Sequence, residues 1–249
     1  MQKRAHRYAL SKPMQWSLCL VVLGLSLASV LLGSRLLMAG LHQYRASVFL
    51  SDWEKKRQAP KDAAWQIAEQ AMREAQDWYP AQNAAYAEQL GYMWQWRAYG
   101  VNPAMASTQE YQQQAIQAFR QATQLRPTWP YAWSGLAYAK LIAGEHDQEF
   151  SRAMQQAVHY GPSRIGVSRR IAEIGLISWP HMDLELRTLT LEQARSTARY
   201  GRSSRAQLFT LAAEIGRVEM LCEYLQDGIK PCASLADTKP APINSTSAK

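Results

Sequence analysis

A cluster of ionisable residues near the middle of the sequence is the most suggestive place to look for chemistry. Glu145, His146, Asp147 and Glu149 lie within five residues of one another. Carboxylate and imidazole groups at this density can bind a divalent ion or transfer protons. The alternative is a turn between two helices, in which the acids favour the N-terminus of the second helix. We favour the turn.

Motifs of the common enzyme classes do not occur in the sequence. There is no H-E-x-x-H, no G-x-S-x-G, no phosphate-binding G-x-x-x-x-G-K-[ST] and no paired C-x-x-C. We therefore predict no catalytic, cofactor-binding or metal-binding residue, and a protein that is not an enzyme.

Aromatic residues are concentrated around two predicted turns, and their faces could stack on sugar rings. One group is Trp129, Tyr131, Trp133 and Tyr138, and the other is Trp94, Trp96 and Tyr99. Packing between helices explains most of them, Trp133 above all. The candidates for partner binding are Trp96 and Trp129.

Arginine is enriched late in the chain, where nine arginines face five acids between residues 164 and 217. A basic groove there could hold an anionic polymer such as an anionic glycan, an acidic partner surface or lipid headgroups. The alternative is a solvated face with salt bridges. Our candidates are Arg169, Arg170, Arg199 and Arg202. The formal charge of +8 is otherwise dilute, so we expect no nucleic-acid partner.

Two cysteines follow the arginine-rich region, ten residues apart. The spacing of Cys222 and Cys232 is not a metal motif. In an oxidising compartment they could close a short loop by forming a disulfide. The alternative is a pair of unrelated thiols, and we favour the disulfide.

An apolar run near the N-terminus predicts a transmembrane helix. The run from Trp16 to Ser34 is uncharged, and it resumes after Arg35 as Leu36 to Leu41. It is long enough to cross a bilayer, with Arg35 near the far interface. A cleaved signal would have a shorter run and a cleavage site. The basic leader predicts a cytoplasmic N-terminus, although Lys55, Lys56 and Arg57 weaken the charge asymmetry.

One spacing recurs three times and predicts an array of helical hairpins. Its members lie 4, 3 and 5 residues apart: Ala68, Met72, Ala75 and Pro80; Ala115, Phe119, Ala122 and Pro127; Phe150, Met154, Ala157 and Pro162. The first three members of each set share one helix face, and the proline ends the helix. Trp133, Leu136 and Ala137 follow the W-x2-L-G part of the tetratricopeptide consensus, but Ala137 stands where that consensus has glycine and Lys140 where it has tyrosine. After Pro162 the pattern becomes looser.

The sequence thus predicts an all-α fold: a single N-terminal transmembrane helix followed by a tetratricopeptide-like helical-repeat domain, or α-solenoid. The predicted parts are a basic leader (1–14), the anchor in the lipid bilayer (15–41), a juxtamembrane helix and linker (42–61), the helical domain (62–227) and a disordered tail (228–249). Asp62 is expected to be a helix N-cap, as is Ser107 or Thr108. A final helix is expected from Ser203, continuing towards Leu225.

Several segments together resemble VpsP-type proteins, which are membrane-anchored, tetratricopeptide-like proteins encoded in bacterial exopolysaccharide biosynthesis clusters. They are the basic leader, the single anchor, LRPTWPYAW (125–133), GEHDQEF (144–150) and the turn at 159–162. The similarity covers residues 15–200 and is strongest over 115–162.

The resemblance implies an accessory scaffold in exopolysaccharide biosynthesis or export. Its partner would be a membrane-embedded protein complex of polysaccharide assembly or export. Its location would be the bacterial inner membrane, with a single pass and most of the chain in the periplasm. The alternatives are a periplasmic chaperone-like accessory of the protein translocon, which shares this layout, and a direct glycan-binding module.

Overall fold

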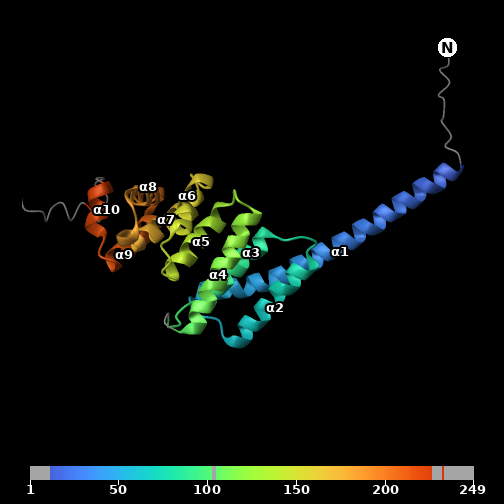
Figure 1. The fold of residues 1–249 in the computed structure, drawn as a ribbon, viewed down its shortest axis with the longest axis horizontal. Helices are drawn as coiled ribbons and strands as arrows, with labels where there is room; N and C mark the ends of the chain where they lie inside the picture. The colour runs from blue at the N-terminus through green and yellow to red at the C-terminus, as the bar shows by residue number, and fades with distance from the viewer. Residues whose placement is uncertain (1–11, 103–104, 226–231, 233–249) are drawn as a thin grey trace, which may run out of the picture. The chain divides into compact units, whose positions relative to one another are not determined.

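The structure, a computed structural model, describes residues 12–102, 105–225 and 232 (Figure 1). Within these ranges every regular element is a helix, which confirms the all-α prediction. The chain divides into two compact units, Met1–Tyr86 and Ala87–Lys249. The leader residues before Lys12 and the predicted tail, apart from Cys232, lie outside the described residues.

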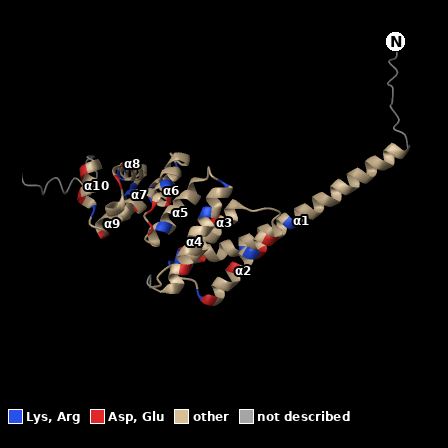
Figure 2. Cartoon of the chain, in the orientation of Figure 1, with Lys and Arg blue, Asp and Glu red and all other residues tan. Residues whose placement is uncertain are grey.

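The first unit contains one long helix, α1 (Lys12–Lys56), and the helix α2 (Asp62–Trp78) that packs along its second half. Residues 13–37 of α1 are exposed, whereas Ala39, Ala46 and Trp53 are buried. Residues 13–34 contain no Lys, Arg, Asp or Glu, as Figure 2 shows. By length and composition, α1 could cross a membrane. Beyond Lys56 the chain leaves the helix through Arg57, whose φ is 50°.

α2 is amphipathic, and the predicted set on its face is confirmed as core. Ala68, Met72 and Ala75 are each at most 1% exposed. The Trp65 ring stacks on Trp53 of α1, with 6.1 Å between ring centroids. The predicted cap is wrong by one residue: Lys61 holds the N-cap position and Asp62 is the first helical residue.

The second unit begins within α3 (Ala84–Ala98) and contains the helices that follow it, which are labelled in Figure 1. They are α4 (Ala106–Leu125), α5 (Pro130–Ile142), α6 (Gln148–Tyr160), α7 (Ile165–Ser178), α8 (Leu184–Tyr200), α9 (Arg202–Glu214) and α10 (Val218–Leu225), with a 3-10 turn η1 (Trp179–His181). Each of α5 and α7 packs on the next helix and also on the next odd-numbered one. Tetratricopeptide-like regularity remains a prediction.

Two predicted helix boundaries in this unit are wrong. The N-cap of α4 is Met105, not Ser107 or Thr108, and its side chain makes no capping bond. The expected final helix is broken into α9 and α10 by Gly216, whose φ is 67°. There the N–H groups of Gly216 and Arg217 donate to the carbonyls of Ala213 and Ala212, which is a Schellman motif.

Phe119 of α4 lies at the centre of the core of the second unit, between two glycines. Its ring faces Gly91 of α3 and Gly135 of α5, so closely that a Cβ on either glycine would collide with the ring. The Tyr92 ring meets it edge-on, with 5.0 Å between centroids. The glycines therefore let three helices close on one aromatic ring.

α8 has the same spacing of buried residues as the three predicted sets, although it was not predicted from the sequence. Thr190, Ala194 and Thr197 lie 4 and 3 residues apart and are all 0% exposed. The two threonine hydroxyls donate to carbonyls four residues earlier, at 2.7 and 2.8 Å, so their burial leaves no unpaired hydroxyl. Thr190 also packs directly against Gly175 of α7. Threonine fills the positions that alanine and larger apolar residues occupy in the earlier sets.

Candidate functional site

Arginine and aromatic side chains in contact with one another form two groups over α3, α5 and α7 and the turns that precede α5 and α7. Glu88 of α3 joins the two groups through its hydrogen bonds to Trp129 and Tyr92. We call the two groups together the arginine–aromatic surface. It consists of the rings of Tyr92, Trp129, Tyr131 and Tyr138 and the guanidinium groups of Arg126, Arg164 and Arg170.

The Trp129 ring is the centre of one half of this surface. The Arg126 guanidinium lies 4.2 Å from the Trp129 ring centroid, and that of Arg164 lies 5.6 Å from it. Arg164 is also 5.9 Å from the ring of Tyr131, which itself lies 5.2 Å from Trp129. Arg126 and Arg164 are exposed, while both rings are half-buried. Cation–π contacts thus hold two exposed charges in place above a fixed aromatic base.

A partly buried carboxylate orients Trp129. The indole Nε1 donates to Glu88 Oε2 of α3 at 2.8 Å. Burial raises the pKa of Glu88, and this outweighs the lowering by the Trp129 hydrogen bond, by the charge of Arg126 and by the Tyr92 hydrogen bond. The indole therefore has one fixed orientation, which is a requirement for a preorganised binding surface.

Arg170 of α7 builds the other half of the surface. Its guanidinium lies 5.0 Å from the ring of Tyr138 on α5 and 6.0 Å from that of Tyr92 on α3. Burial raises the pKa of Tyr138. Arg126, Arg164 and Arg170 form no ion pair with a carboxylate anywhere in the described part of the chain. Arg126 and Arg164 are exposed, so a ligand can reach their guanidinium groups, whereas Arg170 is partly buried.

The structure brings two of the predicted binding residues together and leaves the others apart. Trp129 and Arg170 both belong to the arginine–aromatic surface. Trp96 packs instead on Tyr99 at the end of α3, with 4.9 Å between ring centroids. Arg169 donates to Gln207 Oε1 of α9 at 3.0 Å. Arg199 lies on α8 and Arg202 begins α9, both exposed.

Sequence reasoning missed Arg126 and Arg164, although a signal was present. Arg126 lies beside Pro127 in the turn before α5, and Arg164 lies two residues after Pro162 in the turn before α7. The two turns are one repeat of 35 residues apart, although the two arginines are not at matching positions within them, because Arg164 corresponds to Trp129. Corresponding turns of successive hairpins fall on one face when the hairpins stack. Comparing turns rather than counting arginines would have paired these residues.

The acidic turn at residues 145–149 is organised around a lysine. α5 ends in a Schellman motif at Gly144, whose φ is 73°, and the Glu145 N–H donates to the Lys140 carbonyl at 2.9 Å. This turn leads the carboxylates back to the Lys140 Nζ, which lies 2.6 Å from Glu145, 3.0 Å from Asp147 and 3.1 Å from Glu149. The Lys140 side chain is only 1% exposed. Its ammonium group occupies the place that a cation would take among these acids.

Two further contacts complete this ion-pair network. Arg120 of α4 donates two hydrogen bonds to Glu149, both of 2.8 Å, and these, followed by Lys140, lower the pKa of Glu149 to about 2. Burial raises the pKa of Glu145, but hydrogen bonds from Lys140 and Gln113 outweigh it and lower the pKa. Asp147 also caps α6 by accepting from the Phe150 N–H. The expected turn is therefore present, but its acids are paired rather than simply solvated.

The histidine of this turn stacks on a second histidine. The His146 ring lies 4.4 Å from that of His181 in η1, with an angle of 25° between the ring planes. Burial, followed by the charge of His181, lowers the pKa of His146. Over the described ranges, no three or more His, Cys, Asp and Glu side chains are grouped so that they could hold a metal ion.

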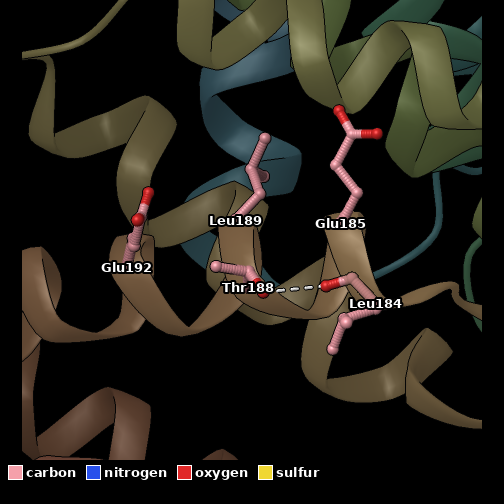
Figure 3. A pocket seen from close by; sticks show the side chains of 5 residues that line it. All are labelled: Leu184, Glu185, Thr188, Leu189 and Glu192. Carbon is pink, nitrogen blue, oxygen red and sulfur yellow. Dashed lines mark hydrogen bonds between the residues drawn. The ribbon is translucent and has the colours of Figure 1, made fainter.

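A shallow depression lies along α8, as Figure 3 shows. Its volume is about 580 Å³, and it is lined by Leu184, Glu185, Thr188, Leu189 and Glu192. The Thr188 hydroxyl donates to the Leu184 carbonyl, and Glu185 accepts from Gln155. The Thr188 hydroxyl and the Glu185 carboxylate are therefore already hydrogen-bonded within the chain.

Comparison with known proteins adds no family. No protein-family model matches the chain, and no curated protein matches it either.

Proposed function

We propose that this protein is a non-enzymatic, membrane-anchored helical scaffold that serves exopolysaccharide biosynthesis or export through protein–protein contacts. The apolar part of α1 is the proposed anchor in the bacterial inner membrane. The N-terminus then lies in the cytoplasm and most of the chain in the periplasm. The setting in exopolysaccharide production rests on the resemblance to VpsP-type proteins, and the docking role rests on the arginine–aromatic surface.

The composition of that surface carries the proposal. Tryptophan, tyrosine and arginine are the residues that contribute most to the stability of protein–protein complexes. Here they come from α3, α5, α7 and the turns between them, and a partly buried hydrogen bond between Trp129 and Glu88 fixes the central ring. Such a rigid display lowers the entropy lost when a partner binds. The anchor holds the surface close to membrane-embedded partners and so raises its effective concentration.

A direct glycan-binding role is the second candidate, and the exposed guanidinium groups favour it. Arg126 and Arg164 are exposed and form no ion pair among the described residues, although the charge of Arg126 also acts on Glu88. Arginines cover the ring faces of Trp129 and Tyr131, so a sugar would bind through its acidic groups rather than by stacking. This candidate therefore requires an anionic polymer.

Site-specific photocrosslinking in cells tests the docking role. A photoreactive phenylalanine analogue is placed at Arg126 or at Arg164, and at Leu184 as a control, because Leu184 is 79% exposed on α8. We expect the first two positions to capture a membrane protein of polysaccharide assembly or export that Leu184 does not. Capture of translocon subunits, or the same products from all three positions, would contradict the proposal. Binding of the purified full-length protein to an anionic polysaccharide alone would support the second candidate.

Substitution of the surface arginines gives the matching prediction. Replacing both Arg126 and Arg164 by alanine is expected to weaken partner association by roughly tenfold or more, since interface arginines often contribute over about 1 kcal/mol each. Their exposure means that unfolding stability should change by less than about 0.5 kcal/mol. Arg202→Ala is the control, because Arg202 is exposed on α9. Co-purification from detergent-solubilised membranes measures the effect, and an equal loss in the Arg202 variant would contradict it.

The redox state of the Cys222–Cys232 pair tests the proposal that most of the chain lies in the periplasm. Cys222 and Cys232 are bonded, with Cα atoms 5.1 Å apart, while Cys19 is a free thiol. Such bonds persist in oxidising compartments and are rare in the cytosol. We expect a thiol-reactive polymer added to denatured, unreduced protein from cells to label one cysteine, and to label three after reduction. Labelling of all three without reductant would place this end of the chain in a reducing compartment.

A further inference from the structure

α1 has an exposed apolar stripe on the C-terminal side of its uncharged segment, residues 13–34. Leu37, Leu41, Tyr44 and Val48 are 63%, 50%, 66% and 51% exposed. They lie 4, 3 and 4 residues apart and so share one face of the helix. α2 covers the other face, where Ala39 and Ala46 are fully buried. Four large apolar side chains in one exposed row indicate an interaction surface.

Arg35 fixes where the bilayer ends on the anchoring proposed above. Its guanidinium donates to the carbonyls of Asp77 and Trp78, at the C-terminus of α2, each at 3.2 Å. A charged group and a helix end do not lie in hydrocarbon without high cost. The uncharged stretch 13–34 is about 33 Å long at about 1.5 Å per residue, close to the hydrocarbon thickness of about 30 Å.

On this anchoring, the hydrocarbon ends near Ser34, within the predicted anchor segment 15–41. The stripe from Leu37 to Val48 then rises about 16 Å outside the hydrocarbon. In that position, lipid tails do not cover it.

The same row continues into the proposed anchor, with Ser34 as its one polar member between Leu20 and Val48. Seven-residue repeats with alternating steps of 3 and 4 place further exposed residues in line with it: Leu20, Leu23, Leu27, Val30 and Ser34. Beyond Val48 the next two positions are the polar residues Ser51 and Lys55, so the apolar row ends there. A sustained seven-residue repeat is the pattern by which two helices pack along a common seam.

We propose that a second copy of this chain covers the stripe, forming a parallel pair of α1 helices from the bilayer to Val48. An occupant must cross the membrane and continue outside it with a matching row. Copies of one single-pass protein share their orientation, so identical rows face each other at the same depth and in register. A peptide arriving from water could cover only the part after Arg35. The pair presents two arginine–aromatic surfaces, and bivalent display strengthens binding to a partner complex.

Cysteine crosslinking along α1 tests this inference in the full-length protein in native membranes. Cys19→Ser provides the background, and single cysteines replace Leu37, Leu41, Tyr44 or Val48. The controls Gly40→Cys and Arg45→Cys lie at exposed positions off the stripe. We expect roughly fivefold more disulfide-linked dimer at the four stripe positions, because seam residues of a parallel pair face each other.

Three outcomes overturn the inference or its premise, and they are distinguishable. Equal crosslinking at stripe and control positions, or none, in protein that resists carbonate extraction overturns the pairing and leaves the anchor intact. Crosslinks from the stripe to a different membrane protein also overturn the pairing. Release of the protein by carbonate overturns the proposed anchor itself. Loss of the dimer in a Leu41→Cys chain that also carries Tyr44→Glu would support the apolar seam.

Discussion

Phe119→Ala is expected to lower the unfolding free energy of the second unit by about 4 kcal/mol, the usual cost of removing a buried aromatic ring. Phe119 is 0% exposed and lies between Gly91 and Gly135. Because neither glycine has a side chain that could move into the space, the cavity would stay open. Urea unfolding of the detergent-solubilised protein, followed by helical circular dichroism, measures the loss.

Leu125→Ala is the matched control for this prediction. Leu125 is the last residue of the same helix and is 37% exposed. Its truncation should cost less than about 1 kcal/mol, since little buried surface is lost. Equal losses in the two variants would mean that the ring between the glycines is not the centre of this core.

The spacing of small and large residues was enough to predict the helices of the hairpins before Pro162. Met72, Phe119 and Met154 were placed on buried faces, and each is at most 1% exposed. The glycines that accommodate Phe119 could not be found in this way, because they belong to other helices. Thr190 and Thr197 were missed for a different reason. A threonine is polar in sequence, and its burial becomes favourable only once the helix supplies a carbonyl acceptor.

The candidate surface was predictable only in fragments. Trp129 and Arg170 were each singled out, but the sequence separates them by 41 positions. Their relation depends on Tyr92 and Glu88 of α3, which contact both halves. Glu88 showed no signal, because an isolated acid on a helix is usually solvated. Tertiary packing, not local pattern, brought these residues together.

The departure from the tetratricopeptide consensus at Lys140 marked a special site more reliably than the acidic cluster itself. A lysine at a position usually filled by an aromatic ring must either reach water or find partners. Here the Schellman turn after α5 reverses the chain, so that three carboxylates from the seven residues after Ile142 lie at the Lys140 ammonium group. The acids that suggested a metal site are therefore explained by a charge on the preceding helix.

Lys140→Met is expected to destabilise the protein by about 3 kcal/mol at pH 7, because removing one partner of a buried ion pair leaves the others uncompensated. Methionine has a similar length, so little packing is lost. Arg120 still holds Glu149, and Asp147 is 56% exposed, which keeps the loss at the lower end of the range. Lys56→Met is the control: Lys56 pairs with Asp52 on the surface, is 61% exposed, and should cost less than about 0.5 kcal/mol.

The pH dependence separates lost charge from lost packing. The pKa of Glu149 is lowered to about 2, and those of Glu145 and Asp147 are also lowered. Carboxylates with a lowered folded-state pKa stabilise the fold above their unfolded pKa of about 4, and this stabilisation is lost as the pH falls towards the folded value. In the Lys140→Met chain, burial still raises the pKa of Glu145, but the ammonium group that lowered it is gone. Protonation of Glu145 at low pH then removes an uncompensated charge and makes the variant less unstable relative to wild type. The stability difference between wild type and variant should therefore be largest at pH 7 and shrink as the pH falls below about 4. Urea unfolding at several pH values measures it, and a difference that stays constant would show that Lys140 acts by filling space alone.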